Sequence, residues 1–87
     1  MDATTDLPKL ARLFRLQWEP AQDAFVLLYP EGMVKLNQSA AEILKRCDGS
    51  TAVAAIVADL EHTFEVDNLN DEVQDFMKEA YERGWLI

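Results

Sequence analysis

The stretch Met33-Val-Lys-Leu-Asn-Gln-Ser-Ala-Ala-Glu-Ile-Leu-Lys-Arg-Cys-Asp-Gly49 predicts a strand that runs directly into a helix. Residues 33–36 mix β-branched and apolar side chains just after a turn at 31–32, a pattern typical of a strand. Asn37 and Ser39 can each cap the free amides of a first helical turn, so we expect the helix to begin there. A strand and a helix joined this closely set the angle between a sheet and every element that follows.

The helix after this joint has its own start and stop signals. Ser39 and Glu42 have the spacing of a capping box, in which each residue's side chain bonds the other's backbone amide. Apolar side chains then recur at helical spacing, at Ala40, Ile43, Leu44 and Cys47. Gly49 suits the left-handed residue that follows a helix, so we expect the helix to end at Asp48 and Gly49.

Two strands are predicted before this stretch and two helices after it. Residues 13–18 and 24–29 have strand-like patterns, and the connections between the strands are short, which favours a three-stranded antiparallel meander. Residues 52–64, with Ser50 or Thr51 as the cap, and residues 69–83 each place their apolar side chains on one helical face. The sequence therefore predicts three strands followed by three helices.

The chain is expected to form one small domain with a polar arm. A three-stranded antiparallel sheet packed on three helices gives a two-layer α+β domain, which we place at residues 11–87. Residues 1–10 are polar and include Pro8, so we expect a flexible N-terminal arm. This arm could also lie along the domain or reach a second copy of the chain.

Charge and composition argue against several classes of protein. The net charge is −8, and residues 48–87 carry ten of the 16 acidic side chains but only two of the eight Lys and Arg residues. Nucleic-acid binding draws on Lys and Arg instead, so we expect no nucleic-acid partner. No apolar run approaches the roughly 20 residues that cross a bilayer, so we expect no membrane partner. A single cysteine fits a reducing compartment, and we expect a cytoplasmic location.

Chemistry-bearing residues are sparse, and the sequence does not predict an enzyme. His62 is the single histidine and is expected to be a solvated or half-buried helix residue. Cys47 lies on an apolar helix face, where a buried, unreactive thiol is expected. Metal-ligand spacings and phosphate-binding glycine loops are absent from the sequence, so we expect no metal and no cofactor.

The strand at 33–36 is expected to lie at an open edge of the sheet, where unpaired amides and carbonyls can pair with another strand. A partner peptide could add there, or the edge could be shielded by the arm or by a dimer. The helix at 69–83 is a candidate for the second wall of a peptide groove. Its candidate groove residues are Val73, Phe76, Met77 and Tyr81, although for Val73 a core position is favoured.

Several motifs resemble the PqqD family, coenzyme PQQ synthesis protein D. They are Leu27-Leu-Tyr-Pro-Glu-Gly-Met-Val-Lys-Leu-Asn-Gln-Ser-Ala, Glu42-Ile-Leu, Cys47-Asp-Gly-Ser-Thr, Val53-Ala-Ala-Ile-Val and Ala80-Tyr-Glu-Arg-Gly-Trp-Leu. The resemblance covers about residues 12–87, and the combination of motifs is specific. The sequence departs from the family pattern at 63–70, which leaves the start of the last helix less defined.

This resemblance implies a winged-helix-like fold and a non-catalytic peptide chaperone, a recognition element for a ribosomally made precursor peptide. In that family the domain binds the precursor peptide PqqA and presents it to the radical S-adenosylmethionine enzyme PqqE, which holds the iron–sulfur clusters. By position, the implied peptide-binding residues are Met33, Val34, Lys35 and Leu36, with Val73, Phe76, Met77 and Tyr81 facing them. Two other classes stay open at this point: a winged-helix nucleic-acid binder, and a structural homodimer formed through strand edges or the arm.

Overall fold

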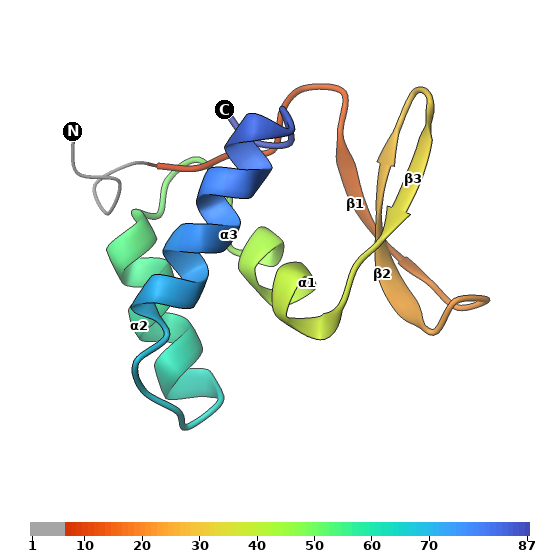
Figure 1. The fold of residues 1–87 in the computed structure, drawn as a ribbon. Coiled ribbons are helices and arrows are strands. Elements are labelled where there is room, and N and C mark those ends of the chain that lie inside the picture. Colours follow the sequence, from red (N-terminus) through yellow and green to blue (C-terminus); the bar gives the residue numbers. More distant parts are fainter. Residues whose placement is uncertain (1–6) are drawn as a thin grey trace.

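The computed structural model describes residues 7–87. Along the chain its elements are β1 (Arg15–Glu19), β2 (Ala24–Tyr29), β3 (Gly32–Lys35), α1 (Gln38–Lys45), α2 (Val53–Thr63) and α3 (Asn70–Glu82). The three strands form one antiparallel sheet in the order β1-β2-β3, and the three helices lie on one side of it (Figure 1). The predicted α+β class, with three antiparallel strands and three helices, is confirmed.

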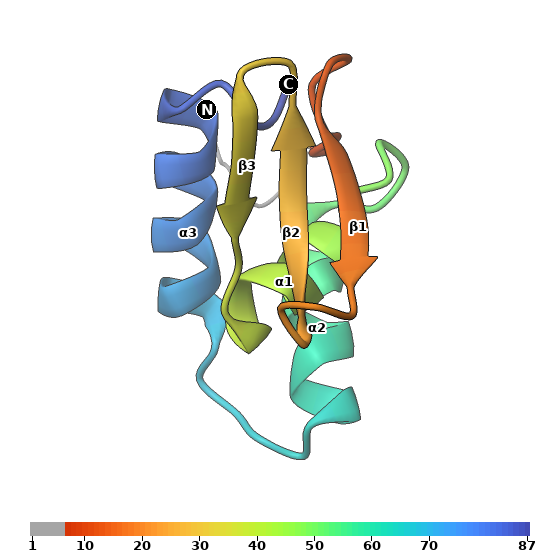
Figure 2. The same cartoon turned by 90° about the vertical axis from the view of Figure 1, so that its right-hand side faces the viewer.

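The sheet packs on the helices through alternate residues of its strands. Leu27 at the centre of β2 lies opposite Leu16 of β1 and Val34 of β3, so the three side chains point to the same face. Leu27 is 0 % exposed and belongs to the hydrophobic core, against which Leu16 and Val34 pack. The other face of the sheet carries no helix (Figure 2). The helices therefore cover only one face of the sheet, and in Figure 1 α1 lies between α3 and the strands.

The joint between β3 and α1 is fixed by two residues. Leu36 is buried, and its amide donates to the carbonyl of Phe25 at 3.0 Å, which holds the end of the strand on β2. Asn37 then caps α1, because its side-chain oxygen accepts from the amide of Ala40 at 2.8 Å. The chain thus changes from strand to helix within two residues, as the sequence predicts.

The predicted capping box does not form. Asn37 supplies the cap, and Ser39 lies inside the first turn of α1. The carboxylate of Glu42 accepts from the side chains of Lys45, at 2.9 Å, and Arg46, at 3.0 Å. These two cations lower the pKa of Glu42, and they take the carboxylate away from the helix start.

Two further start and stop signals act differently from the prediction. α1 ends at Lys45 with Arg46 as its C-cap, so Gly49 lies in the turn to α2 and not directly after a helix. Ser50 and Thr51 do not cap α2: its N-cap is Ala52, and no side chain bonds the free amides there. Both residues instead bond the carboxylate of Asp48, which closes the turn between the two helices.

The end of α3 agrees with the prediction. Gly84 has φ +78° and donates to the carbonyl of Tyr81, and the amide of Trp85 donates to the carbonyl of Ala80 at 2.9 Å. This pair of bonds is the Schellman arrangement that terminates helices at glycine. It turns the chain back, so that Leu86 is buried in the core.

Part of the predicted N-terminal arm lies along the domain. Pro8 is buried, and its carbonyl accepts from the amide of Gly49 at 2.9 Å. Lys9 and Ile87 exchange two backbone hydrogen bonds, so the arm and the C-terminal residues pair side by side. Residues 7–10 therefore follow the alternative in which the arm rests on the domain, whereas residues 1–6 lie outside the described residues.

The cap gives a direct test of the joint. Asn37→Ala removes the side-chain acceptor for the Ala40 amide and should destabilise the protein by about 1 kcal/mol. That loss corresponds to a fall in Tm of about 4–8 °C for a domain of this size. Ser39→Ala is the matched control, because Ser39 makes no cap, and it should leave the melting temperature near that of the wild type. If Ser39→Ala lowers the melting temperature more than Asn37→Ala does, Ser39 is the cap and the capping box predicted from the sequence is correct.

Candidate peptide-binding site

β3 has an open edge with backbone groups that point away from the sheet. Because the Leu36 amide donates to Phe25, the amide of Val34, two residues earlier, also points toward β2. The amides and carbonyls of Met33 and Lys35 alternate with these and point outward. β3 is the last strand of the sheet among the described residues, so these outward groups face the open edge. The edge therefore offers two amides and two carbonyls to an incoming strand.

A groove lies beside this edge, between β3 and α3, with α1 behind it. We call it the β3–α3 groove; its volume is about 420 Å³. Its lining residues are Val34, Lys35, Leu36, Asn37, Ser39, Ala40, Ile43, Glu72, Asp75, Phe76, Glu79, Ala80, Arg83 and Trp85. In Figure 2 α3 runs in the direction opposite to β3, and in Figure 1 α1 lies between these two elements. An added strand would thus find unpaired backbone on one side and side chains of a helix on the other.

The structure brings four of the eight sequence-predicted site residues together in this groove. Val34, Lys35 and Leu36 line it from the strand, and Phe76 lines it from the helix. Phe76 is half-buried and packs against the edge of the core, so one side of its ring remains available. Met33 contributes its outward backbone to the edge, and its side chain, 49 % exposed, belongs to the face of the sheet without helices.

The other three predicted residues of α3 do not line the groove. Val73 and Met77 are each 2 % exposed and form part of the core, and for Val73 this agrees with the favoured alternative. Tyr81 is half-buried and packs against the core. These residues hold α3 in place, and Phe76 is the apolar side chain of the predicted set that faces the groove.

Charged residues of α3 line the groove next to Phe76, and sequence reasoning did not select them. Glu72, Asp75 and Glu79 share one helical face at spacings of three and four residues, next to the buried stripe. Glu79 pairs with Arg83 at 2.8 Å, and the Arg83 guanidinium lies over the ring of Trp85 at 5.5 Å. No ion pair joins Glu72 or Asp75 to another residue within 7–87. The spacing was visible in the sequence, but only the structure shows that this face meets β3.

Cys47 and His62 take no part in the groove. Cys47 is buried, and its thiol donates to the carbonyl of Ile43 at 3.3 Å. Burial, with a smaller contribution from the nearby charge of Asp48, raises the pKa of the Cys47 thiol to about 12. His62 is an exposed residue of α2. Residues 7–87 contain no group of three or more acidic, His or Cys side chains arranged to hold a metal ion, and none of their helices has the length and apolar character to span a membrane.

The family model for coenzyme PQQ synthesis protein D (PqqD) matches residues 24–86 of the chain. The chain belongs to the PqqD family. The match begins at β2 and continues through α3, so it includes both walls of the β3–α3 groove.

Individual relatives agree with this assignment to the PqqD family. The chain is 55 % identical over 89 residues to the PqqA binding protein of Azotobacter vinelandii, covering 99 % of this chain and 97 % of that protein. It is 49 % identical to the PqqA binding protein of Stutzerimonas stutzeri, and this match covers 94 % of this chain and 90 % of that protein. A similar solved structure is the PqqD truncation of Methylobacterium extorquens PqqCD, described as a stand-alone RiPP recognition element. Its TM-score to this chain is 0.81 at 27 % identity, and the match covers 97 % of this chain and 92 % of that one.

Neighbouring residues of α3 should separate a core role from a groove role. Met77→Ala should destabilise the protein by about 2–5 kcal/mol, because Met77 is buried on all sides. Phe76→Ala should cost less in denaturant unfolding, since the Phe76 ring is only half-buried. Equal losses for the two variants would mean that Phe76 is a core residue and not a wall of the groove.

The thiol gives a second, independent test of the core. With its pKa raised to about 12, Cys47 is almost entirely protonated in the folded protein near neutral pH. Only the thiolate reacts, so iodoacetamide at about pH 8 should not modify native Cys47. In denaturant the pKa returns to about 8.5 and alkylation should become fast. Rapid modification of the native protein, measured by mass spectrometry, would contradict the buried position.

Proposed function

We propose that this protein is a peptide-binding component of pyrroloquinoline quinone biosynthesis that holds a PqqA-like precursor peptide as a fourth strand on β3. The observation that carries this proposal is the outward backbone of Met33 and Lys35 beside a groove that has both apolar and charged lining residues. The name PqqA binding protein, given to relatives up to 55 % identical, agrees with a peptide ligand.

The energetics require both the strand and the groove. Each added hydrogen bond contributes about 0.5–1.5 kcal/mol, whereas ordering one peptide residue costs about 1–2 kcal/mol. The gain from the backbone hydrogen bonds therefore roughly offsets the cost of ordering the peptide. Net affinity has to come from burying apolar peptide side chains, which contributes about 1.5–3 kcal/mol for each side chain. Val34 and Leu36 provide the strand side of such a contact, and Phe76 and Trp85 provide the helix side.

The roles of the eight proposed site residues differ. The backbone of Met33 and Lys35 pairs with the peptide, while Val34, Leu36 and Phe76 contact its side chains. Val73, Met77 and Tyr81 would act indirectly, since they pack in or against the core and hold α3 in place.

The proposed activity is binding and presentation. The protein would raise the local concentration of the peptide at a radical S-adenosylmethionine enzyme of the PqqE type, without a cofactor of its own. The buried, protonated Cys47 and the exposed His62 are consistent with a non-catalytic role.

Proline at position 35 tests the strand-addition model. Lys35→Pro removes an amide that points outward, so it leaves the bonds to β2 in place and should weaken PqqA binding roughly tenfold. Lys35→Ala is the control, because it removes the same ammonium group and keeps the amide. Binding is measured by isothermal titration calorimetry, with sedimentation to register any homodimer. Equal affinities for the proline and alanine variants would contradict strand addition.

A further inference from the structure

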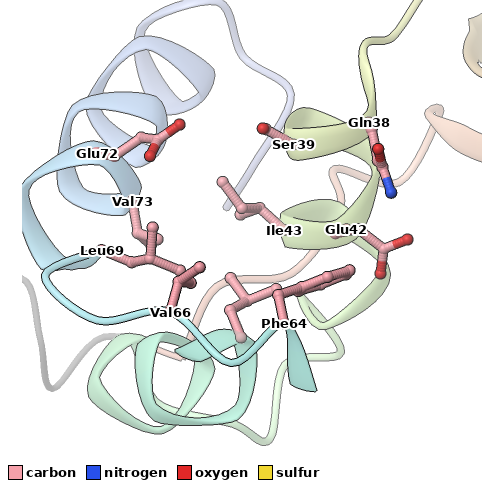
Figure 3. A pocket seen from close by; sticks show the side chains of 10 residues that line it. Gln38, Ser39, Glu42, Ile43, Phe64, Val66, Leu69, Glu72 and Val73 are labelled. Atoms are coloured by element: carbon pink, nitrogen blue, oxygen red, sulfur yellow. The ribbon is translucent and has the colours of Figure 1, made fainter. Parts of the chain in front are cut away.

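A second apolar pocket opens at the end of the β3–α3 groove. It lies between α1, the connection from α2 to α3, and the first turn of α3, and we call it the α1–α3 pocket (Figure 3). Its volume is about 230 Å³, and its apolar lining consists of Ile43, Leu60, Phe64, Val66, Leu69 and Val73. In Figure 3 Ile43 and Val73 point toward one another across it.

The pocket adjoins the groove. Ser39, Ile43 and Glu72 line both spaces, so these three residues form their shared boundary. Ser39 and Glu72 belong to the first turns of α1 and α3, and Ile43 lies one turn after Ser39 in α1. A peptide paired with β3 would therefore enter the pocket if it continued in an extended form beyond Lys35.

The size of the pocket indicates what can fill it. A volume of about 230 Å³ is below the roughly 300–1,000 Å³ of pockets that hold small-molecule ligands. Phe64 and Val66 at its rim are 41 % and 46 % exposed, which leaves apolar surface in water unless a ligand covers it. A single large apolar side chain matches both the volume and the rim.

The pocket is held open before any ligand binds. The amide of Val66 donates to the carbonyl of Glu61, and the amide of Leu69 donates to the Glu61 carboxylate, both at 3.0 Å. Glu65 and Asn68 both lie in the connection from α2 to α3 and have left-handed backbone conformations, with φ of +54° and +62°, which turn the chain there. Since the rim is already ordered, a ligand would lose little free energy in arranging it.

The charge at the boundary between pocket and groove indicates which kind of peptide residue lies next to the apolar side chain in the pocket. Glu42 is neutralised by Lys45 and Arg46, whereas Glu72 has no ion-pair partner within residues 7–87. Asp75, on the same wall of the groove, also has none within this range. A basic residue of the peptide would meet Glu72 where the groove adjoins the pocket, with Asp75 on the groove side of that boundary.

We infer that the precursor peptide continues past the end of β3 and buries one large apolar side chain, flanked by a basic residue, in the α1–α3 pocket. This inference rests on the proposed function, because the same peptide occupies β3. It extends the binding site from one strand edge to two adjoining subsites, of which the second selects for an apolar residue next to a positive charge.

Variants of the rim test the apolar subsite. Phe64→Ala and Val66→Ala should each weaken binding of the PqqA precursor, Phe64→Ala by about tenfold, while the exposed positions keep the fold stable. Leu13→Ala is the matched control: Leu13 is 64 % exposed and lines neither space, so its affinity should stay within about twofold of the wild type. In a titration of isotope-labelled protein, the amides of residues 64–69 should shift together with those of residues 33–36.

Two further tests address the carboxylate of Glu72 and the peptide residue that fills the α1–α3 pocket. Glu72→Gln should weaken binding about threefold at low salt, whereas Asp71→Asn, which removes an acid from the same first turn outside the pocket, should not. Alanine replacements along the peptide, combined with Phe64→Ala in double-mutant cycles, should identify one apolar residue coupled to Phe64.

The outcomes separate the two proposals. If Lys35→Pro weakens binding while Phe64→Ala and Val66→Ala bind like the wild type, the pocket inference is wrong and strand addition stands. If Lys35→Pro has no effect, strand addition is wrong and so is a site continuous with it. If Lys35→Pro and the two rim variants all weaken binding, and Phe64 is coupled to one apolar residue of the peptide, the results support the extended site.

Discussion

The joint at Leu36 and Asn37 is the constraint on which the remaining structure depends. Leu36 is bonded to β2 and buried, and Asn37 caps α1 in the next position. With no flexible residues between strand and helix, α1 has one direction relative to the sheet. α2 and α3 pack on it in turn, and the space between α3 and β3 follows from that arrangement (Figure 1).

This arrangement leaves one strand edge open next to a helix that does not cover it. An open edge is a hazard, because any exposed strand can pair with it. In the proposed complex the adjacent wall would limit what can pair, because Phe76 favours apolar side chains and the carboxylates of Glu72 and Asp75 favour basic ones. On that proposal the backbone of β3 would supply general affinity for extended peptide, and α3 and the α1–α3 pocket would supply selection among peptides.

Local signals in the sequence predicted the elements well and the caps less well. The span of β2 was predicted residue for residue, and Gly84 ends α3 as expected. The capping box failed because Lys45 and Arg46 compete for the carboxylate of Glu42, and Asn37 already satisfies the Ala40 amide. Competition between alternative hydrogen-bond partners is settled by free-energy differences of about 1 kcal/mol, which spacing alone does not reveal.

The sequence by itself determined the order and type of the elements, since strand and helix periodicity and turn residues act over short distances. It also determined the acidic balance and, through its motifs, the resemblance to the PqqD family. Only the tertiary structure decided which side of α3 faces β3: Phe76 lines the groove, and Met77, the next residue, lies in the core. Adjacent residues of a helix point about 100° apart, so the rotation of α3 about its axis decides which of them faces the groove, and packing against the other helices sets that rotation.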